Sequence, residues 1–407
     1  MKKLNYIDLF AGCGGLSDGF ESTGLFKGLA HIEWEAQALE TLKNRLVEKY
    51  NKRKSHNCIH FDIQRIDELF EGFEKDSKYD DFIGLNKILQ EEKVDIVIGG
   101  PPCQAYSIAG RIQDKDGMKN DYRNYLFESY IEVLNKTKPD LFVFENVPGI
   151  LSASPGGYPI VNRIKDAFDK AGYELIDNFK DALHDLSNFG IPQKRKRIIL
   201  VGLSKKKFKD KNNVLLKEFY LSFKDKYSKS FKTTAEQALK GLPKITPLHN
   251  KIEGSKRASH VLGANSKILN HQPRFHNNRD IEIFHLLAKD IETGMLAYTS
   301  SEALKNLYTE MTGKSSAIHK YHVIRKDAPS NTIPSHLYKD GLRHIHWDSQ
   351  QARSLTVREC ARLQSFDDDF NFLGSQGDQY KMIGNAVPPK FAKILAEHIF
   401  NFFGQNL

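Results

Sequence analysis

The sequence predicts an α/β fold in which a parallel sheet is covered by helices on both faces. Short apolar runs alternate with longer amphipathic stretches over residues 1–203, and this alternation is typical of parallel sheets. A glycine-rich loop follows the first apolar run directly, as in strand-loop-helix units that bind nucleotides. The chain has 407 residues, of which 40% are hydrophobic and 27% charged, so it is long enough for two packed domains.

The predicted elements follow one another in a regular order. We expect strands at 4–10, 29–32, 94–98, 141–144 and 198–201. We expect helices from about residue 16 and at 34–50, 125–135 and 160–171. Ligands of parallel sheets bind at the carboxyl ends of the strands. The residues expected at that edge are Asp8, Glu33, Asp62, Gly99 and Glu145.

The alternation ends after Gly202, and we expect a second domain from residue 204 onward. The whole chain has 60 Lys+Arg and 51 Asp+Glu, a formal net charge of +9. Residues 204–350 alone contain 26 Lys+Arg and 14 Asp+Glu, beginning with a lysine cluster at 205–211. This concentration of positive charge suits a polyanionic partner. A solvated lysine surface is the alternative interpretation.

The cysteines and the apolar runs exclude several classes of protein. Cys13, Cys58, Cys103 and Cys360 lie far apart and form no CxxC pair, so neither a disulfide framework nor a zinc site is indicated, and we expect no metal. The apolar runs are much shorter than the roughly 20 residues that span a bilayer, and no charged and apolar leader opens the sequence. We therefore expect a cytoplasmic protein without membrane contact.

The glycine loop has the sequence DLFAGCGGLSDGF from Asp8 onward, with glycines at 12, 14 and 15. The spacing is not GxGxxG, and a carboxylate at Asp8 would repel a diphosphate, so a cationic ligand with an adenosine tail fits better. Glu33, at the end of the second strand, can accept hydrogen bonds from both ribose hydroxyls, and Trp34 can stack on the adenine. A glycine turn without a ligand is the alternative.

Cys103 lies in the loop GGPPCQAYSIAG, directly after the predicted strand 94–98. Most cysteines are small buried hydrophobic residues. Here two prolines stiffen the loop, and the preceding strand delivers it to the ligand edge of the sheet. Even a small thiolate fraction is strongly nucleophilic, so Cys103 is a candidate nucleophile.

Two further motifs can face the same pocket. Glu145 follows the strand 141–144 directly, although, taken alone, a helix cap or a surface turn would explain it better. Arg195 and Arg197 lie two residues apart ahead of the next strand, so both guanidinium groups share one face and can reach phosphates or a base carbonyl. A basic strand edge is the alternative.

In this order, the motifs resemble those of the DNA cytosine-5 methyltransferases. The matching segments are DLFAGCGG from Asp8, PPCQAYS from Pro101, ENV from Glu145, QKRKR from Gln193, RSLTVRECARLQSF from Arg353 and GNAVPP from Gly384. The resemblance covers nearly the whole chain outside 204–350. It implies a Rossmann-like sheet for S-adenosylmethionine-dependent methyl transfer at 1–203, completed by 380–407, with a smaller target-recognition domain inserted at 204–379.

The resemblance also implies the site residues. Those assigned to the S-adenosylmethionine pocket are Asp8, Phe10, Gly12, Gly14, Glu33, Trp34, Asp62, Ile63, Pro102, Leu126 and Asn385. Cys103 would attack C6 of a cytosine flipped out of a specific double-stranded DNA sequence. Glu145 would hydrogen-bond N4 and share a proton at N3, and Arg195 would neutralise charge near O2.

The expected partner is therefore double-stranded DNA. The residues expected to contact it are Gln104, Ser107, Arg197, Arg274, Arg279 and Arg343. Arg353 and Arg358 are expected to organise the second domain instead. The resemblance implies a bacterial restriction-modification methylase: a nucleoid-associated monomer, with a companion restriction endonuclease that acts on the same site without stable contact.

Two other functions stay open at this point. A tRNA cytosine-5 methyltransferase shares the PPCQ loop, but that loop typically continues Pro-Phe-Thr, whereas here it continues Ala105, Tyr106 and Ser107. A DNA-binding regulator without catalysis is disfavoured because Cys103, Glu145 and Arg195 are all intact.

Overall fold

The computed structural model of the chain divides into two compact units. Unit 1 comprises Met1–Phe189, Arg195–Ser230 and Ala386–Leu407, and unit 2 comprises Gly190–Lys194 and Phe231–Asn385. The structure describes residues 2–52, 57–90, 92–102, 126–154, 157–209, 212–229, 231–248, 258–263, 268–405 and 407. Cys103, Gln104 and Ser107 therefore lie outside the described residues.

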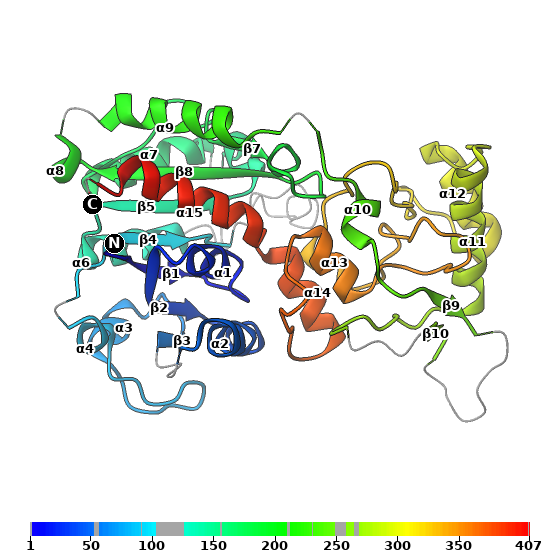
Figure 1. Cartoon of the computed structure of the whole chain (residues 1–407), viewed down its shortest axis with the longest axis horizontal. Helices are drawn as coiled ribbons and strands as arrows, with labels where there is room; N and C mark the ends of the chain where they lie inside the picture. Colours follow the sequence, from blue (N-terminus) through cyan, green and yellow to red (C-terminus); the bar gives the residue numbers. More distant parts are fainter. Residues whose placement is uncertain are drawn as a thin grey trace. The chain divides into compact units, whose positions relative to one another are not determined.

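Unit 1 is built on one sheet with the strand order β3-β2-β1-β4-β5-β8-β6, and β7 pairs with β8 (Figure 1). The neighbours among its first five strands are parallel. These strands are β1 (Leu4–Leu9), β2 (Phe26–Glu33), β3 (Cys58–His60), β4 (Ile96–Gly99) and β5 (Leu141–Asn146). A mainly parallel sheet with helices on both sides confirms the predicted α/β class.

The remaining strands are β6 (Tyr173–Glu174), β7 (Leu183–Asp185) and β8 (Lys196–Ser204). Strand β8 is antiparallel to β5, β6 and β7, so β8 opposes the direction of the others, which differs from the expectation of a parallel sheet. A parallel pair needs a crossover of a dozen or more residues. The connection from β7 to β8 has only residues 186–195, so the chain returns antiparallel.

Helices cover both faces of the sheet, as the register of three strands shows. Tyr6 is in register with Ile96, and Ile96 with Leu141, so these side chains share one face and Phe142 lies on the other. The ring of Tyr6 meets helix α1 (Gly15–Ser22), since its centroid lies 5.5 Å from that of Phe20. The ring of Phe142 stacks on Phe168 of helix α7 (Ile160–Lys170), at 4.4 Å.

Four helices of unit 1 agree in place with those predicted from about residue 16 and at 34–50, 125–135 and 160–171. On the first face lie α1 (Gly15–Ser22), α2 (Ala36–Tyr50), α9 (Asn212–Tyr227) and α15 (Pro389–Phe403). On the second face lie α3 (Ile66–Glu71), α4 (Leu85–Leu89), α6 (Leu126–Thr137) and α7 (Ile160–Lys170). Shorter elements are η4 (Pro148–Ser152), η6 (Leu186–Phe189) and α8 (Lys205–Phe208).

The C-terminal helix α15 packs on the first helix of the chain. Gly15 and Gly19 on α1 allow this, because a Cβ on Gly15 would collide with the carbonyl of Val387, and one on Gly19 with Ala392. α9 packs against α15 in turn, where the ring of Phe219 lies 4.7 Å from that of His398. The last segment of the chain, from Ala386 onward, therefore belongs to unit 1.

Unit 2 has little sheet, in keeping with the loss of alternation in its sequence. Its strands are β9 (Ile245–Pro247) and β10 (His260–Leu262), an antiparallel pair. Its helical elements are α10 (Ala235–Leu239), α11 (Asn278–Thr293), α12 (Ser301–Thr312), η8 (Ser335–Tyr338), α13 (Val357–Leu363) and α14 (Gln376–Asn385). One apolar core packs α11 and α12 against the segments around Tyr321 and Ile345.

The boundary of unit 2 lies later in the chain than the expected boundary of the second domain at 204. The reason is α9, which buries Phe219, Tyr220 and Phe223 in unit 1. The hydroxyl of Tyr220 also accepts a hydrogen bond from the N–H of Val201 and donates one to the carbonyl of Ile199 on β8, at 2.8 Å each.

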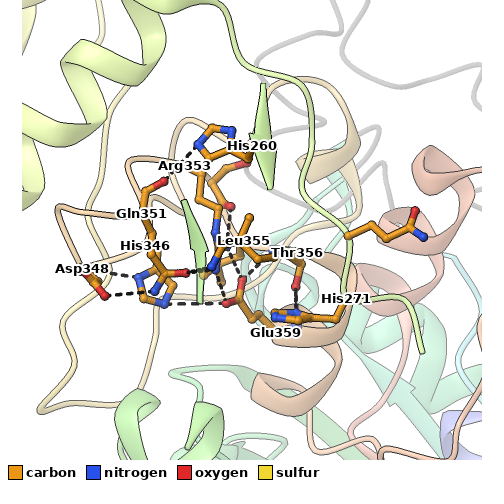
Figure 2. Close-up of polar contacts among 12 residues, drawn as sticks. His260, His271, His346, Asp348, Gln351, Arg353, Leu355, Thr356 and Glu359 are labelled. Carbon is orange, nitrogen blue, oxygen red and sulfur yellow. Dashed lines mark hydrogen bonds and ion pairs between the residues drawn. The ribbon is translucent and has the colours of Figure 1, made fainter. Parts of the chain in front are cut away.

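A buried ion pair holds the second half of unit 2 together (Figure 2). The guanidinium of Arg353 binds both carboxylate oxygens of Glu359 at 2.7 Å, and neither side chain is more than 2% exposed. Glu359 also closes a capping box with Thr356 at the start of α13. Arg358 is fully buried and donates to the carbonyls of Leu269, Asp367 and Phe370. Both arginines organise unit 2, as expected.

Candidate active site

The candidate site lies at the edge of the sheet where the parallel strands of unit 1 end. Leu9, the last residue of β1, is in register with Gly99 of β4, and Gly99 is in register with Phe144 of β5. The glycine loop, the segment after Gly99 and Glu145 therefore leave the sheet side by side. The sequence predicted this edge as the ligand-binding edge.

The glycine loop makes a tight turn between β1 and α1. Phe10, Gly12 and Gly14 all have positive φ, at 57°, 56° and 94°. A Cβ on Gly14 would collide with Leu42, so only glycine fits there, whereas a Cβ on Gly12 would meet nothing within 4 Å. The loop thus leaves open space beside its backbone at Gly12.

Glu33 connects this loop to the end of β2. Its carboxylate accepts hydrogen bonds from the N–H groups of Gly12 (2.7 Å), Trp34 (2.9 Å) and Glu35 (2.8 Å). Burial raises the pKa of Glu33, and these hydrogen bonds oppose the shift. A carboxylate oxygen has two lone pairs, so Oε2, which binds Gly12, can accept another hydrogen bond from a hydroxyl group.

Trp34 and Asp62 flank Glu33 at the same edge. Trp34 is 46% exposed, which leaves a large indole surface open to stacking. Asp62 lies two residues after β3, and its Oδ1 accepts a hydrogen bond from the N–H of Gln64 at 3.0 Å. Ile63 beside it is buried.

Asp8 faces helix α1. Its Oδ2 accepts a hydrogen bond from the Ser17 hydroxyl (2.5 Å), whose oxygen lies 2.8 Å from Nδ1 of His31. Burial raises the pKa of Asp8 to about 7, with a further contribution from Glu33, and burial lowers the pKa of His31 to about 3. The other oxygen of Asp8, Oδ1, has no hydrogen-bond partner among the described residues.

Glu145 packs directly against the start of the loop that leads to Cys103. A Cβ on Gly100 would lie 2.6 Å from Oε2 of Glu145, so the absence of a side chain at Gly100 makes room for the carboxylate. The other oxygen, Oε1, forms an ion pair with Nε of Arg197 at 2.7 Å, and the two side chains are 12% and 13% exposed. Burial lowers the pKa of Arg197, and Glu145 opposes this shift.

Arg195 lies on the same face of the chain as Arg197 but has a different environment. It is fully buried, and its Nη2 donates to the carbonyl of Ala386 at 3.1 Å. Burial, followed by the nearby Arg197, lowers its pKa, and Glu145 opposes this. The shared face was expected from the sequence. The pairing of Arg197 with Glu145 was not, because it depends on β5 and β8 being neighbours.

Two other cofactor candidates lie at the ends of described segments, and a third lies at the end of a helix. Pro102 is half-buried and precedes the undescribed part of its loop, and Leu126 is buried at the start of α6. Asn385 is exposed at the end of α14 and belongs to unit 2.

The lysine cluster lies at the opposite edge of the sheet. Because β8 is antiparallel, Ile198 pairs with Asn146 at the site edge, and Leu203 pairs with Leu141 at the other edge. Lys205 and Lys207 follow there and pair with Asp169 and Asp140. The described lysines of this cluster are thus remote from the candidate site, in keeping with the alternative interpretation of a solvated lysine surface.

The arginines of unit 2 expected to contact DNA differ in their surroundings. The guanidinium of Arg274 lies over the ring of Tyr380, at 4.6 Å, and donates to the carbonyl of Leu337. Arg279 is exposed and pairs with its neighbour Asp280 at 3.2 Å. Arg343 is exposed and donates to the carbonyl of His319 at 2.8 Å.

Arg343 belongs to a group of cationic side chains in unit 2, which we call the His322 cluster. Partial burial, followed by four of these neighbours, lowers the pKa of His322. The neighbours are Arg343, His319, Arg325 and Lys194. Arg343 and Lys339 also help to lower the pKa of His336, where Asp340 opposes them. Sequence reasoning found Arg343 but not the cluster, because Lys194 is distant from the others in the sequence.

The sheet order, together with a glycine loop tied to an acidic residue at the end of the second strand, defines a Rossmann-like methyltransferase fold. The family description C-5 cytosine-specific DNA methylase matches residues 4–401, and the chain belongs to that family. It is a DNA cytosine-5 methyltransferase.

Relatives agree with this assignment, and a solved structure agrees with the fold. The chain is 34% identical to the Type II methyltransferase M.Bpa9945I of Bacillus paralicheniformis, over 97% of this chain and 98% of the relative. It is 31% identical to the Type II methyltransferase M1.HphI of Haemophilus parahaemolyticus, over 97% and 86%. A candidate DNA modification methyltransferase encoded within an E. coli prophage has a similar fold, with a TM-score of 0.63 at 21% identity over 99% of this chain and 100% of that one.

Hydropathy adds one more observation. In the parts of the chain that the structure describes, no helix is both long enough and apolar enough to cross a membrane.

Proposed function

We propose that the protein transfers the methyl group of S-adenosylmethionine to C5 of a cytosine flipped out of a specific double-stranded DNA sequence. The observation that carries the proposal is the contact of Glu145 with Gly100 on one side and Arg197 on the other. It puts a paired carboxylate next to the backbone that leads, three residues later, to Cys103.

The residues of the edge suit the cofactor. Gly12 leaves open space, Glu33 has an oxygen that can accept a ribose hydroxyl, and Trp34 exposes its indole for stacking with adenine. The buried carboxyl of Asp8 acts on the cofactor indirectly: it accepts a hydrogen bond from Ser17 and so supports the turn of the glycine loop. When bound, the cofactor supplies an electrophilic methyl group and leaves as a neutral thioether.

Cys103 is the proposed nucleophile. Its thiolate adds to C6 of the cytosine, so that an S–C6 bond forms, the C5=C6 double bond opens and C5 becomes nucleophilic. After C5 has gained the methyl group, a base removes the C5 proton and the thiolate leaves C6, which restores the aromatic ring.

Glu145 and Arg197 are proposed to stabilise the charge that this addition places on the ring. Glu145 hydrogen-bonds the N4 amino group and shares a proton at N3. We assign the neutralisation of charge near O2 to Arg197, since its guanidinium binds the same carboxylate in the structure. Arg195, expected in that role from the sequence, is better explained as a positioning residue, because it is fully buried against the carbonyl of Ala386.

Unit 2 is proposed to recognise the DNA sequence and to offset the cost of flipping the base, which is a few kcal/mol. The His322 cluster, with Arg343, is the part of unit 2 that suits phosphate contacts. The described relatives are named Type II methyltransferases. We infer that this chain modifies DNA in a bacterial restriction-modification system, as a monomer in the cytoplasm beside a companion endonuclease that acts on the same site.

The test has a chemical and a positional readout. Purified protein, DNA and cofactor with a labelled methyl group should give labelled DNA, and bisulfite sequencing should find one modified cytosine in a fixed sequence context. Cys103→Ala should abolish transfer and still bind DNA. With 5-fluorocytosine at the target, a covalent adduct should persist on denaturing gels, because fluorine cannot leave as a proton does. Labelling of tRNA instead of DNA, or turnover by Cys103→Ala, would overturn the proposal.

A further inference from the structure

A compact hairpin stands beside the proposed cofactor pocket and has no assigned role. It runs from Gly72 to Gly84, where Phe73 and Phe82 exchange two backbone hydrogen bonds of 2.9 and 3.0 Å. The two glycines close its base, both with positive φ (97° and 88°). A Cβ on Gly72 would lie 2.6 Å from the carbonyl oxygen of Phe82, so the base of the hairpin is tightly packed.

Arg65 fixes this hairpin to the end of β3. Its guanidinium lies over the rings of Phe61 (4.9 Å), Phe73 (5.5 Å) and Tyr79 (5.5 Å). It also donates to Asp76 at 2.8 Å. Phe61 directly precedes Asp62, and its N–H binds the carbonyl of Glu33 at 3.1 Å. The hairpin is thus anchored to the two strand ends that carry the proposed ribose and adenine contacts.

The tip of the hairpin reaches Trp34. Asp76 caps the turn, since its Oδ1 accepts from the N–H groups of both Lys78 and Tyr79 at 2.7 Å. The ring of Tyr79 meets that of His60 edge-on at 5.1 Å, and Nε2 of His60 lies 2.9 Å from the carbonyl oxygen of Trp34.

Lys78 at this tip is placed over the indole of Trp34. Its Nζ lies 5.6 Å from the centroid of the Trp34 ring and 5.0 Å from that of Tyr79. Tyr79, followed by the carboxylates of Asp62 and Asp76, raises the pKa of Lys78, so the ammonium is charged and near Asp62. A cation over an aromatic face is held weakly at an exposed site and can move with its flexible stem.

We propose that the hairpin 72–84 forms the outer wall of the adenosyl pocket and that Lys78 closes over the adenine stacked on Trp34. The inference rests on the proposed cofactor. Trp34 provides one face of the adenine pocket, since 46% of its surface is exposed. Lys78 provides the opposite face, since its ammonium already lies over the Trp34 ring. The ammonium can donate to a purine ring nitrogen, while its aliphatic stem covers the base.

The same hairpin offers a matched control. Lys75 is also exposed, but its Nζ pairs with Asp80 at 3.2 Å. Lys75→Ala therefore removes one cation from the hairpin without removing the one over Trp34. Lys78→Arg keeps a cation that can lie over an aromatic ring, so it should restore binding.

The experiment measures the dissociation constant of S-adenosylhomocysteine by isothermal titration, together with KM for S-adenosylmethionine and kcat. We expect Lys78→Ala to weaken binding about two- to five-fold, the range for an exposed cation–aromatic contact. KM should rise by a similar factor with kcat unchanged, and Lys78→Arg and Lys75→Ala should match the parent protein. A Lys78→Ala variant that binds as tightly as Lys75→Ala, or more tightly than the parent, would overturn the inference alone. A parent protein that binds no adenosyl compound would overturn the proposed cofactor and this inference with it.

Discussion

The side chains of Arg197 and Glu145 meet as a close ion pair between two strands that are far apart in the sequence. Nε of Arg197 lies 2.7 Å from Oε1 of Glu145, and both groups are almost completely buried. The antiparallel pairing of β5 and β8 creates this contact, since Glu145 is in register with Ile199, and Arg197, two residues before Ile199, lies on the same face. The pair fixes the carboxylate against Gly100.

Removing Arg197 should disable catalysis without removing Glu145. Arg197→Ala leaves a carboxylate buried without its cation and leaves the charge near O2 of the cytosine uncompensated. We expect kcat for methyl transfer to fall by roughly 10²- to 10³-fold, the range for loss of one group that stabilises developing charge. Single-turnover labelling of DNA at saturating cofactor measures this rate.

Neighbouring residues of β8 provide the controls. Lys196→Ala changes an exposed cation between the two arginines and should leave the rate within two-fold of the parent. Arg195→Ala empties a fully buried position and should lower the melting temperature as well as the rate. A normal rate for Arg197→Ala would contradict the assignment of charge neutralisation to Arg197.

Trp34 should contribute stacking energy to cofactor binding. Trp34→Ala removes the exposed indole at the end of β2. We expect S-adenosylhomocysteine to bind about 1–3 kcal/mol more weakly, the range for stacking of a base on an aromatic side chain. Titration calorimetry measures the loss, and Trp347→Phe in unit 2 is the control, since Trp347 stacks on His346 and not on a cofactor residue. Equal affinities for both variants would rule out the stacking role.

Substitutions of Arg343 and Arg274 should distinguish a loss of DNA contact from a loss of folding stability. Arg343 is exposed in the His322 cluster, so Arg343→Ala should weaken DNA binding and lower the slope of log affinity against log salt by about 1. Arg274 lies over Tyr380 and holds the carbonyl of Leu337, so Arg274→Ala should destabilise unit 2 instead. DNA titrations at several salt concentrations, with melting curves of both variants, distinguish the two effects. A salt slope unchanged in Arg343→Ala would remove Arg343 from the phosphate contacts.

Much of unit 1 could be predicted from the sequence because its signals are local. The glycine loop, the apolar strands and the polar residues that follow them are contiguous, so the ligand edge with Glu33, Trp34 and Glu145 follows from the chain order. The direction of β8 does not follow in this way. It depends on a connection too short for a crossover, and the partner of Glu145 depends on that direction.

In unit 2 the sequence shows which residues are charged but not which are free to bind. Arg274, Arg279 and Arg343 look alike in a basic segment, yet one lies over a tyrosine ring, one pairs with an aspartate and one is part of an exposed cluster. Tertiary packing makes this difference. The contact of Lys78 with Trp34 also depends on tertiary packing, because it forms only when Arg65 holds the hairpin 72–84 against the end of β3.

Unit 2 should lose stability in acid before unit 1 does. Burial lowers the pKa of His260 and His346 to about 4 and that of His276 and His344 to about 3. Histidine in the unfolded chain has a pKa near 6.5, so below that pH the unfolded chain binds protons that the buried histidines of the folded chain do not bind. Stability should therefore be full above about pH 6.5 and fall as the pH drops toward 4. A histidine whose pKa is 6.5 in the unfolded chain and about 4 in the folded one contributes roughly 3 kcal/mol of folding stability at neutral pH, which is lost in acid.

In unit 1 the carboxyl group of Asp8 opposes the acid sensitivity of the buried histidines His31 and His184, whose pKa values burial lowers to about 3. The Asp8 carboxyl has the opposite pH dependence. Its pKa is raised to about 7, so its protonated form is favoured by folding, and its contribution is lost as the pH rises from about 4 to 7. Each unit contains one of the two tryptophans of the chain, Trp34 in unit 1 and Trp347 in unit 2, so the fluorescence of each tryptophan reports on the unfolding of its own unit. In denaturant titrations between pH 8 and 4, the midpoint reported by Trp347 in the Trp34→Phe variant should fall with pH. The midpoint reported by Trp34 in the Trp347→Phe variant should fall less, because Asp8 opposes His31 and His184. A midpoint for Trp347 that is constant over this range would mean that the buried histidines of unit 2 do not control its stability.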